Sequence, residues 1–222
     1  MSTVFIISAP SGSGKSTLVS EVRQIVPGLD FSISYTTRQP RGSEQNGREY
    51  FFVSRPEFEA MVQQDEFLEH AEVFGNYYGT ARRLLREAQH NGHDLLLDID
   101  VQGADQIKKK LPEAVSIFIL PPNRQTLEWR LKNRSEDTEE VIHRRLVTAT
   151  REIENYWKYD YILINDRLED STDALKAVLL AERMKRSKVK QSADGSQTLA
   201  RAESCRLENV RERLRPILDS FK

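Results

Sequence analysis

The stretch from Val4 to Thr17 constrains the fold of this chain more than any other part of its sequence. A short apolar run, Val4–Ser8, leads into the loop Ser11-Gly12-Ser13-Gly14-Lys15-Ser16-Thr17, and a helical pattern begins near Ser16. In a strand–loop–helix unit of this kind, glycines let backbone N–H groups turn toward phosphate oxygens, and the helix N-terminus adds a positive dipole end. The stretch therefore predicts a nucleoside triphosphate site on an α/β fold.

Within this loop, Lys15 is expected to reach the β- and γ-phosphates, and the Ser16 hydroxyl to coordinate Mg²⁺. One position departs from the usual pattern, because Ala9 stands where Gly-x-x-x-x-Gly-Lys-Ser/Thr has its first glycine. Alanine tolerates a positive φ poorly, so residue 9 must take an ordinary backbone conformation or bear strain. The predicted ATP contacts in this part of the chain are Ala9, Pro10, Ser11, Gly12, Ser13, Gly14, Lys15, Ser16 and Thr17.

Beyond the loop, short β-rich runs alternate with longer helical patterns, which predicts βαβ units and a parallel sheet covered on both faces. The fold class is therefore α/β. Strands are expected at 4–8, 32–36, 95–99, 115–120 and 161–165, and helices at 16–26, 57–64, 103–110, 124–132, 139–157 and 170–184. Residues 37–80, with a short strand at 50–53, indicate an insertion, and the charged residues 122–150 indicate a helical excursion of the kind that serves as a lid.

Composition excludes several other classes of protein. Cys205 is the chain's one cysteine, so no disulfide scaffold can form. The aliphatic runs are far shorter than the roughly 20 residues of a membrane helix, and the N-terminus lacks the stages of a signal peptide, so a cytoplasmic protein is expected. The net charge of −1 also argues against a chain built to coat nucleic acid.

That net charge conceals two opposed parts. Residues 183–222 hold 11 Lys+Arg and 5 Asp+Glu, a net of +6, whereas residues 1–182 hold 22 and 29, a net of −7. Residues 187–196 are expected to form a flexible connection, and Leu207, Val210 and Leu214 fall at helical spacing, with Pro216 expected to end that helix. A solubilising tail is the simplest interpretation. An oligomer contact or an anion-binding tail stays open, so nucleic acid binding is not expected for residues 1–182 but remains an open question for the tail.

Two carboxylates lie at the end of the third core strand. Asp98 and Asp100 lie at i and i+2, so both can face the site, where they could hold Mg²⁺ or accept a ligand N–H. The alternative is that they cap the following helix, a position that favours Asp.

The insertion carries candidates for a second substrate. Thr37-Arg38-Gln39-Pro40-Arg41 sets two guanidinium groups three residues apart, and Arg suits a phosphate dianion because it offers paired N–H donors. Tyr50 and Tyr78 could add hydroxyl donors. The alternative is that these Arg residues are solvated and that the Tyr residues pack.

Together these segments resemble guanylate kinase. The resemblance rests on Ser8–Ser16, Thr36–Arg41, Gly75-Asn76-Tyr77-Tyr78-Gly79-Thr80, Leu97-Asp98-Ile99-Asp100-Val101-Gln102-Gly103 and Ile164-Asn165-Asp166, and it covers about residues 3–184. It implies a P-loop three-layer core (1–36, 81–121 and 151–184) with a GMP-binding insertion at 37–80 and a lid at 122–150. Residues 185–222 then form a basic C-terminal tail, partly helical or flexible.

The resemblance also implies roles for single residues. Arg38, Arg41, Tyr50 and Tyr78 would hold the GMP phosphate, and Ser34, Glu69 and Thr80 would contact guanine with Asp98 or Asp100. One carboxylate such as Glu69 can accept both guanine N1–H and N2–H₂, which adenine cannot offer, and an unpaired buried polar site rejects such an analogue by roughly 10⁴–10⁵. Lys15, Arg38, Arg130, Arg134 and Arg145 would act in phosphoryl transfer, with Arg144 the nearest alternative to Arg145. Asn165 would lie on the adenine side, and Ser16 and Asp98 would serve the metal.

The predicted activity is transfer of the ATP γ-phosphoryl group to GMP, with Mg²⁺ as cofactor and dGMP as a further acceptor. Two alternatives are a catalytically inactive guanylate kinase-like module that binds proteins, and a nucleoside monophosphate kinase for another base. The intact loop and Arg set argue against the first, and Glu69 and Thr80 argue against the second.

Overall fold

A computed structural model describes residues 2–73, 75–134, 138–187 and 193–222, without the side chains of residues 134, 187, 193 and 194. The chain divides into two compact units, Met1–Ile6 with Gly28–Ala114 and Ile7–Pro27 with Val115–Lys222. Strand β1 (Val4–Ser8) contributes to both units. The domain limits expected from the sequence stay predictions.

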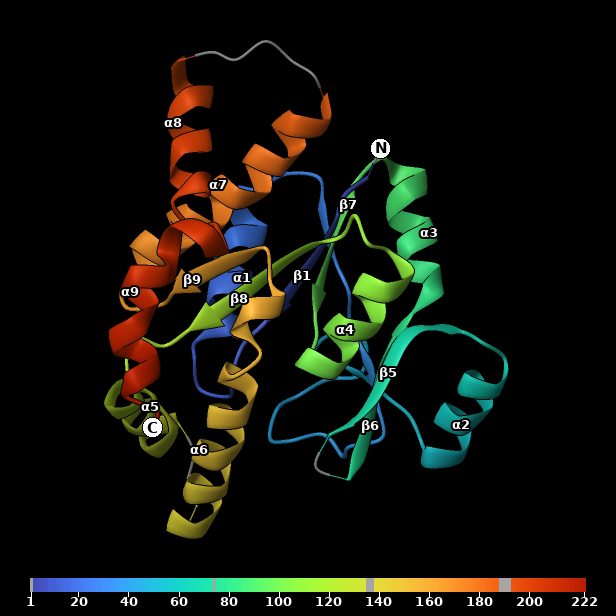
Figure 1. The fold of residues 1–222 in the computed structure, drawn as a ribbon. Helices are drawn as coiled ribbons and strands as arrows, with labels where there is room; N and C mark the ends of the chain where they lie inside the picture. The colour runs from blue at the N-terminus through green and yellow to red at the C-terminus, as the bar shows by residue number, and fades with distance from the viewer. Residues whose placement is uncertain (1, 74, 135–137, 188–192) are drawn as a thin grey trace. The chain divides into compact units, whose positions relative to one another are not determined.

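The first unit contains the strands of a four-stranded sheet and also β2 (Leu29–Phe31) and β7 (Asp94–Asp98) of a five-stranded sheet (Figure 1). Its other elements are β3 (Tyr35–Thr36), β4 (Phe51–Phe52), α2 (Arg55–Gln63), β5 (Phe67–Val73), β6 (Asn76–Ala81), α3 (Arg82–Asn91) and α4 (Val101–Lys110). Strands β3 to β6 form a four-stranded sheet of order β4-β3-β6-β5, in which β6 is antiparallel to both neighbours. Helix α4 packs on β5, and α3 packs on β7.

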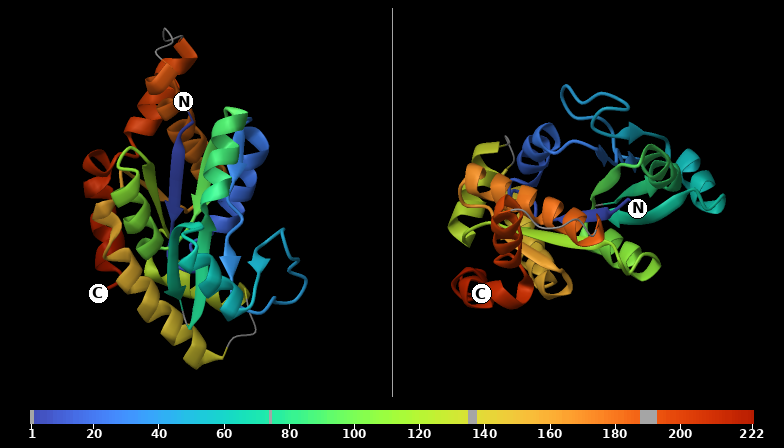
Figure 2. Two further views of the ribbon diagram at one scale, coloured as in Figure 1. Left: turned by 90° about the vertical axis from the view of Figure 1, so that its right-hand side faces the viewer. Right: turned by 90° about the horizontal axis from the view of Figure 1, so that it is seen from above.

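The second unit carries the loop after β1 and the C-terminal half of the chain. Its elements are α1 (Lys15–Ile25), β8 (Val115–Leu120), α5 (Arg124–Arg134), α6 (Glu139–Ile153), the 3₁₀ turn η1 (Tyr156–Lys158), β9 (Tyr161–Ile164), α7 (Leu168–Ser187), α8 (Ala193–Glu203) and α9 (Leu207–Asp219). Helix α1 packs on α7, and α8 lies along α7 in both views of Figure 2.

Besides the four-stranded sheet, the fold contains a five-stranded sheet of order β2-β7-β1-β8-β9. Its β2–β7 and β8–β9 pairs are parallel. All residues of β1 and β8 are buried, as are four of the five in β7. Near-continuous apolar strands of this kind are typical of a parallel sheet covered on both faces, because neither face meets water. The predicted α/β class with a P-loop core is confirmed.

Several predicted elements differ in their limits. The strand expected at 32–36 is wrong as a single element, since β2 ends at Phe31 and β3 covers Tyr35–Thr36. The helix expected at 139–157 ends at Ile153. Strands β5 and β6 and helix α3 were not predicted. None of the helices in the described parts of the chain combines the length and hydrophobicity that crossing a membrane requires.

The C-terminal segment packs within the second unit. Leu214, Ile217 and Phe221 are buried, and the N–H of Ile162 on β9 donates to the Cys205 carbonyl over 2.8 Å. Pro216 lies inside α9 and does not end it, which corrects the sequence prediction. The helix continues because its last turn buries Ile217, and the Ser220 hydroxyl donates to the Ile217 carbonyl. Of the flexible connection expected at 187–196, residues 188–192 lie outside the described residues, and the rest is helical, because α7 extends to Ser187 and α8 begins at Ala193.

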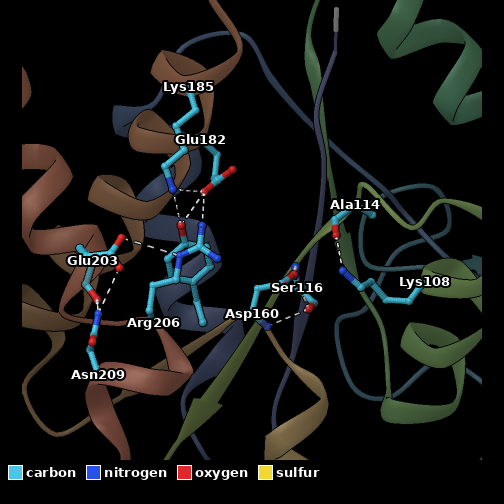
Figure 3. A network of polar contacts seen from close by, with 10 residues as sticks. Lys108, Ala114, Ser116, Asp160, Glu182, Lys185, Glu203, Arg206 and Asn209 are labelled. Atoms are coloured by element: carbon cyan, nitrogen blue, oxygen red, sulfur yellow. Dashed lines mark hydrogen bonds and ion pairs between the residues drawn. The ribbon is translucent and has the colours of Figure 1, made fainter. Parts of the chain in front are cut away.

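Glu182 of α7 links this segment to β9 (Figure 3). Its Oε1 accepts hydrogen bonds from the Tyr161 hydroxyl at 2.5 Å, from Lys185 Nζ at 2.9 Å and from an Arg206 guanidinium N–H at 3.2 Å. The Arg206 guanidinium also lies 4.5 Å from the centre of the Tyr161 ring. Because Tyr161 is fully buried and Glu182 is nearly so, this cluster joins β9, α7 and the start of α9 through charge-assisted hydrogen bonds.

Candidate active site

The loop after β1 has the backbone geometry that its glycines predict. Gly12 and Gly14 adopt φ angles of 90° and 85°, and α1 begins at Lys15 immediately after Gly14. Ala9 is not among the described residues with positive φ, so the departure at this position introduces no backbone strain of that kind. The turn is closed by the Ser13 N–H, which donates to the Pro10 carbonyl over 3.1 Å.

Two side chains of the second unit fix the loop at Ser13. The Asn165 amide donates to the Ser13 carbonyl over 2.7 Å, and an Arg130 N–H donates to the same oxygen over 3.4 Å. Asn165 follows β9 and is 5% exposed, and a Cβ on Gly14 would clash with its amide. Burial lowers the pKa of Arg130, against the opposing charge of Asp166. Both residues therefore lie at the phosphate loop.

The predicted lid helices also contact this loop. Leu127 and Leu131 of α5 lie so close to Gly12 that a Cβ there would come within 3.0 Å and 2.9 Å of them. From α6, an Arg145 N–H donates to the Ser11 hydroxyl over 2.8 Å. Its neighbour Arg144 is exposed and pairs with Glu140 at 3.8 Å, so of this pair Arg145 is the one that meets the loop. Arg134 ends α5, and its side chain lies outside the described part.

In the first unit, three of the predicted GMP phosphate ligands form a cluster. The Arg38 guanidinium lies 5.3 Å from the centre of the Tyr50 ring, and the rings of Tyr50 and Tyr78 are 5.9 Å apart. Burial lowers the pKa of Arg38, but hydrogen bonding and the charge of Glu44, with a smaller effect of Tyr78, raise it overall. Arg41 is exposed, and its backbone N–H donates to Glu44 over 2.8 Å.

Glu69 is the most unusual ionisable group of this unit. It is 3% exposed on β5 and is paired in register with Thr80 on β6. Burial raises the pKa of its carboxyl from 4.5 to about 7. The Thr80 hydroxyl and the charge of Lys110 oppose that rise, and the charge of Asp100 adds to it. The Thr80 hydroxyl is buried and makes no hydrogen bond of regular geometry with a described residue, although it lies near enough to affect Glu69. Ser34 is buried as well.

The two carboxylates at the end of β7 and just beyond it have different surroundings. Asp100 caps α4, because its Oδ1 accepts a hydrogen bond of 2.8 Å from the Gly103 N–H. The capping alternative considered from the sequence is thus observed for Asp100. Asp98 ends β7 and is partly exposed. Among the described residues, no three His, Cys, Asp or Glu side chains gather as a metal site.

Comparisons with known proteins agree on one family. The family model described as guanylate kinase matches residues 1–182. A guanylate kinase of Koribacter versatilis is 60% identical over 99% of this chain and 96% of its own length, and one of Escherichia coli is 48% identical over 86% and 94%. The crystal structure of guanylate kinase from Anaplasma phagocytophilum has a TM-score of 0.68 and 35% identity, covering 82% of this chain and 87% of its own.

The chain belongs to the guanylate kinase family. The resemblance inferred from the sequence motifs is confirmed, and the protein-binding module that was considered as an alternative is not favoured. What the motifs missed are the residues that hold the predicted site residues in place. Glu44 is the clearest case, because its carboxylate accepts two hydrogen bonds from Arg38, of 3.0 Å and 2.9 Å. A lone acid within the basic segment 38–48 is the signal that could have identified it.

Proposed function

We propose that this chain is an ATP-dependent nucleoside monophosphate kinase that transfers the γ-phosphoryl group of ATP to GMP, forming ADP and GDP. The observation that carries the proposal is the buried Glu69 carboxyl, paired with Thr80 and in the same unit as the Arg38, Tyr50 and Tyr78 cluster. Membership of the guanylate kinase family supports the same reaction.

On the acceptor side, the Glu69 carboxylate accepts hydrogen bonds from guanine N1–H and N2–H₂. The hydroxyls of Ser34 and Thr80, with Asp98 or Asp100, complete the contacts to the base. Arg38, Arg41, Tyr50 and Tyr78 hold the GMP phosphate, and Glu44 orients Arg38 through its paired hydrogen bonds. Arg suits this role because its planar fork matches phosphate oxygens. The same contacts would admit dGMP, since none of them requires the ribose 2′-hydroxyl.

On the donor side, residues 9–17 enclose the ATP phosphates, and Asn165 lies toward the adenine. Lys15, Arg130, Arg134 and Arg145 neutralise charge on the phosphoryl group as it transfers, and Arg38 does so from the acceptor side. Phosphoryl transfer depends on positioning and electrostatic stabilisation, so this set of cations needs no covalent nucleophile.

The hydroxyl of Ser16 and the carboxylate of Asp98 are hard oxygen donors of the kind that suits Mg²⁺, and these two residues would hold the ion. When bound with ATP, the metal would neutralise charge on the β- and γ-phosphates. The cytoplasmic location, any homo-oligomer and the tail's affinity for nucleic acid remain predictions.

A coupled assay tests the proposal directly. ADP release is followed with ATP, Mg²⁺ and each of GMP, dGMP, AMP, CMP and UMP. We expect turnover with GMP and dGMP and at least about 10⁴-fold lower kcat/KM with AMP, because Glu69 would face an unprotonated N1. Glu69→Ala should raise the KM for GMP, whereas Lys15→Ala should mainly lower kcat. No turnover with GMP by the wild-type chain would overturn the proposal.

A further inference from the structure

We infer that Gln106 and Lys110 of α4 are positioning residues for guanine recognition, because they hold the outer edge of β5 on either side of Glu69. The inference rests on the proposed function. Neither residue was singled out by the sequence motifs, and both act through the backbone of another element.

The need for such residues comes from the place of β5 in its sheet. In the order β4-β3-β6-β5, strand β5 pairs with β6 on one side and forms the edge on the other. The pairing register shifts between Phe67 and Glu69, which leaves a bulge at Leu68 directly before Glu69. The outer backbone groups of an edge strand have no strand partner, and a bulge disrupts the ladder locally. The sheet alone therefore holds Glu69 weakly.

Side chains of α4 supply the missing backbone partners. The Gln106 amide N–H donates to the His70 carbonyl over 2.7 Å, and its amide oxygen accepts from the His70 N–H at 3.3 Å. The Gln106 amide thus takes the place of a peptide group in a neighbouring strand. On the other side of Glu69, Lys110 Nζ donates to the Leu68 carbonyl.

The same face of α4 also defines where the Glu69 carboxylate can lie. Gly103, Gln106 and Lys110 are spaced at i, i+3 and i+7, which puts them on one side of a helix. A Cβ on Gly103 would come within 2.5 Å of the Glu69 Oε2, so the carboxylate packs directly on this glycine. Asp100 fixes the same turn by accepting from the Gly103 N–H. Helix α4 therefore holds Glu69 at the residue before it, at the residue after it and at its carboxylate.

Gln106 and Lys110 differ in one respect that an experiment can use. Gln106 is neutral, so it acts on Glu69 through geometry alone. Lys110 acts through geometry and also through its charge, which favours the ionised carboxylate, whereas the charge of Asp100 opposes it. Among the described residues around Glu69, the groups that shift the pKa of its carboxyl are Asp100, Lys110 and the neutral Thr80.

Steady-state kinetics with GMP and ATP, measured from pH 6 to pH 9, separate these effects. The variants are Gln106→Leu and Lys110→Met, with Lys110→Arg as the conservative replacement. Lys109→Met removes the same charge from an exposed neighbouring position, and Gln89→Leu makes the same change at an exposed position of α3, so these two serve as controls. Thermal unfolding of each variant monitors the fold.

We expect Gln106→Leu, which removes both hydrogen bonds to His70, and Lys110→Met, which removes the hydrogen bond to Leu68, each to raise the KM for GMP about tenfold. The KM for ATP and kcat should stay within about twofold. As the pH rises and Glu69 ionises, the KM for GMP should fall. In Lys110→Met the midpoint of this fall should move to higher pH, whereas in Gln106→Leu the midpoint should not move. Lys110→Arg should restore both quantities.

The outcomes keep the two proposals apart. If the wild-type chain does not phosphorylate GMP, the proposed function fails. If it does, and the two variants match Lys109→Met and Gln89→Leu in their KM for GMP, the inference is overturned. The inference is also overturned if kcat and both KM values change together with the unfolding temperature, because that pattern indicates a purely structural role.

Discussion

At the scale of single residues, Glu69 shows how a group proposed to recognise a ligand can lower the stability of its own fold. Its 3% exposure withholds water from the carboxylate, which raises its pKa to about 7. The same burial leaves two acceptor oxygens that a guanine base can satisfy and that water cannot reach freely. We therefore expect the buried carboxylate to lower the free energy of unfolding of the nucleotide-free protein, and GMP binding to remove this destabilisation.

The first prediction concerns the pH dependence of this destabilisation. The unfolded carboxyl ionises near pH 4.5 and the folded one near pH 7, so between these values the folded state binds more protons and stability falls as the pH rises. At about 1.4 kcal/mol per pKa unit, the full loss is roughly 3 kcal/mol. Glu69→Gln avoids this loss, so the variant should gain stability relative to wild type between pH 5 and pH 8.

Urea unfolding at several pH values, without nucleotide, measures this difference. Glu72→Gln, at an exposed position of the same strand, is the matched control and should show no such trend. A Glu69→Gln difference that stays constant from pH 5 to pH 8 would contradict the assignment of a raised pKa to Glu69.

The second residue-scale prediction concerns Gly103. Alanine is favoured over glycine inside a helix by about 1 kcal/mol, so Gly103→Ala would stabilise α4 if nothing lay against it. Because the added Cβ would meet the Glu69 carboxylate at 2.5 Å, we expect lower stability and about a tenfold higher KM for GMP. Thermal unfolding and GMP kinetics test this together. A more stable variant with an unchanged KM would be the opposite result.

Sequence alone could predict those features of the proposed site that are encoded locally. The conformation of the phosphate loop could be predicted because seven adjacent residues encode it. Glu44, Gln106 and Lys110 could not, because each is a common surface residue type whose role depends on what it meets. Gln106, for example, contacts His70, which is 36 positions away in the sequence.

At the scale of elements, α5 and the phosphate loop depend on each other. Leu127 and Leu131 are fully buried, and both lie against Gly12, whose φ of 90° already excludes most other residues. The loop therefore forms part of the surface on which the predicted lid helix packs. A change at Gly12 should affect the loop conformation and the helix together.

The prediction is that Gly12→Ala raises the KM for ATP at least tenfold and leaves the KM for GMP nearly unchanged. Gly92→Ala is the matched control, because Gly92 also has a positive φ, of 68°, but nothing within 4 Å of an added Cβ. The control should cost about 1–2 kcal/mol in stability from backbone strain alone. If both variants changed the ATP kinetics equally, a general loss of stability rather than the local change at Gly12 would be the cause.

Elements with strong periodicity or continuous apolar character were predictable, and weaker ones were not. Strands β1 and β8 match their predicted limits because every residue in them is buried. Strand β5 contains Glu69, His70 and Glu72 among its seven residues, so its sequence lacks the apolar run that indicated the other strands. The prediction that Pro216 ends α9 was wrong for a different reason. Burial of Ile217 outweighs the tendency of Pro216 to interrupt the helix.

At the scale of the whole chain, the basic segment after residue 183 is packed within its unit. The basic segment supplies Cys205 and Arg206 to the edge of β9 and contributes Val210, Leu214, Ile217 and Phe221 to the buried interior of its unit. Some of its positive charges are paired with carboxylates of the same chain, since Arg206 pairs with Glu182 and Lys222 pairs with Asp219. Its net charge of +6 therefore overstates what an acidic partner would meet.

The final prediction follows from this packing. Arg206→Met should lower the free energy of unfolding by about 1–2 kcal/mol, because Glu182 keeps Lys185 and Tyr161 but loses one charge-assisted hydrogen bond. Ending the chain after residue 187 removes several large buried side chains, so we expect a fall of at least about 10 °C in the unfolding temperature. Arg211→Met, at an exposed position of α9, is the control. A shortened chain that unfolds at the wild-type temperature would restore the solubilising tail as the correct interpretation.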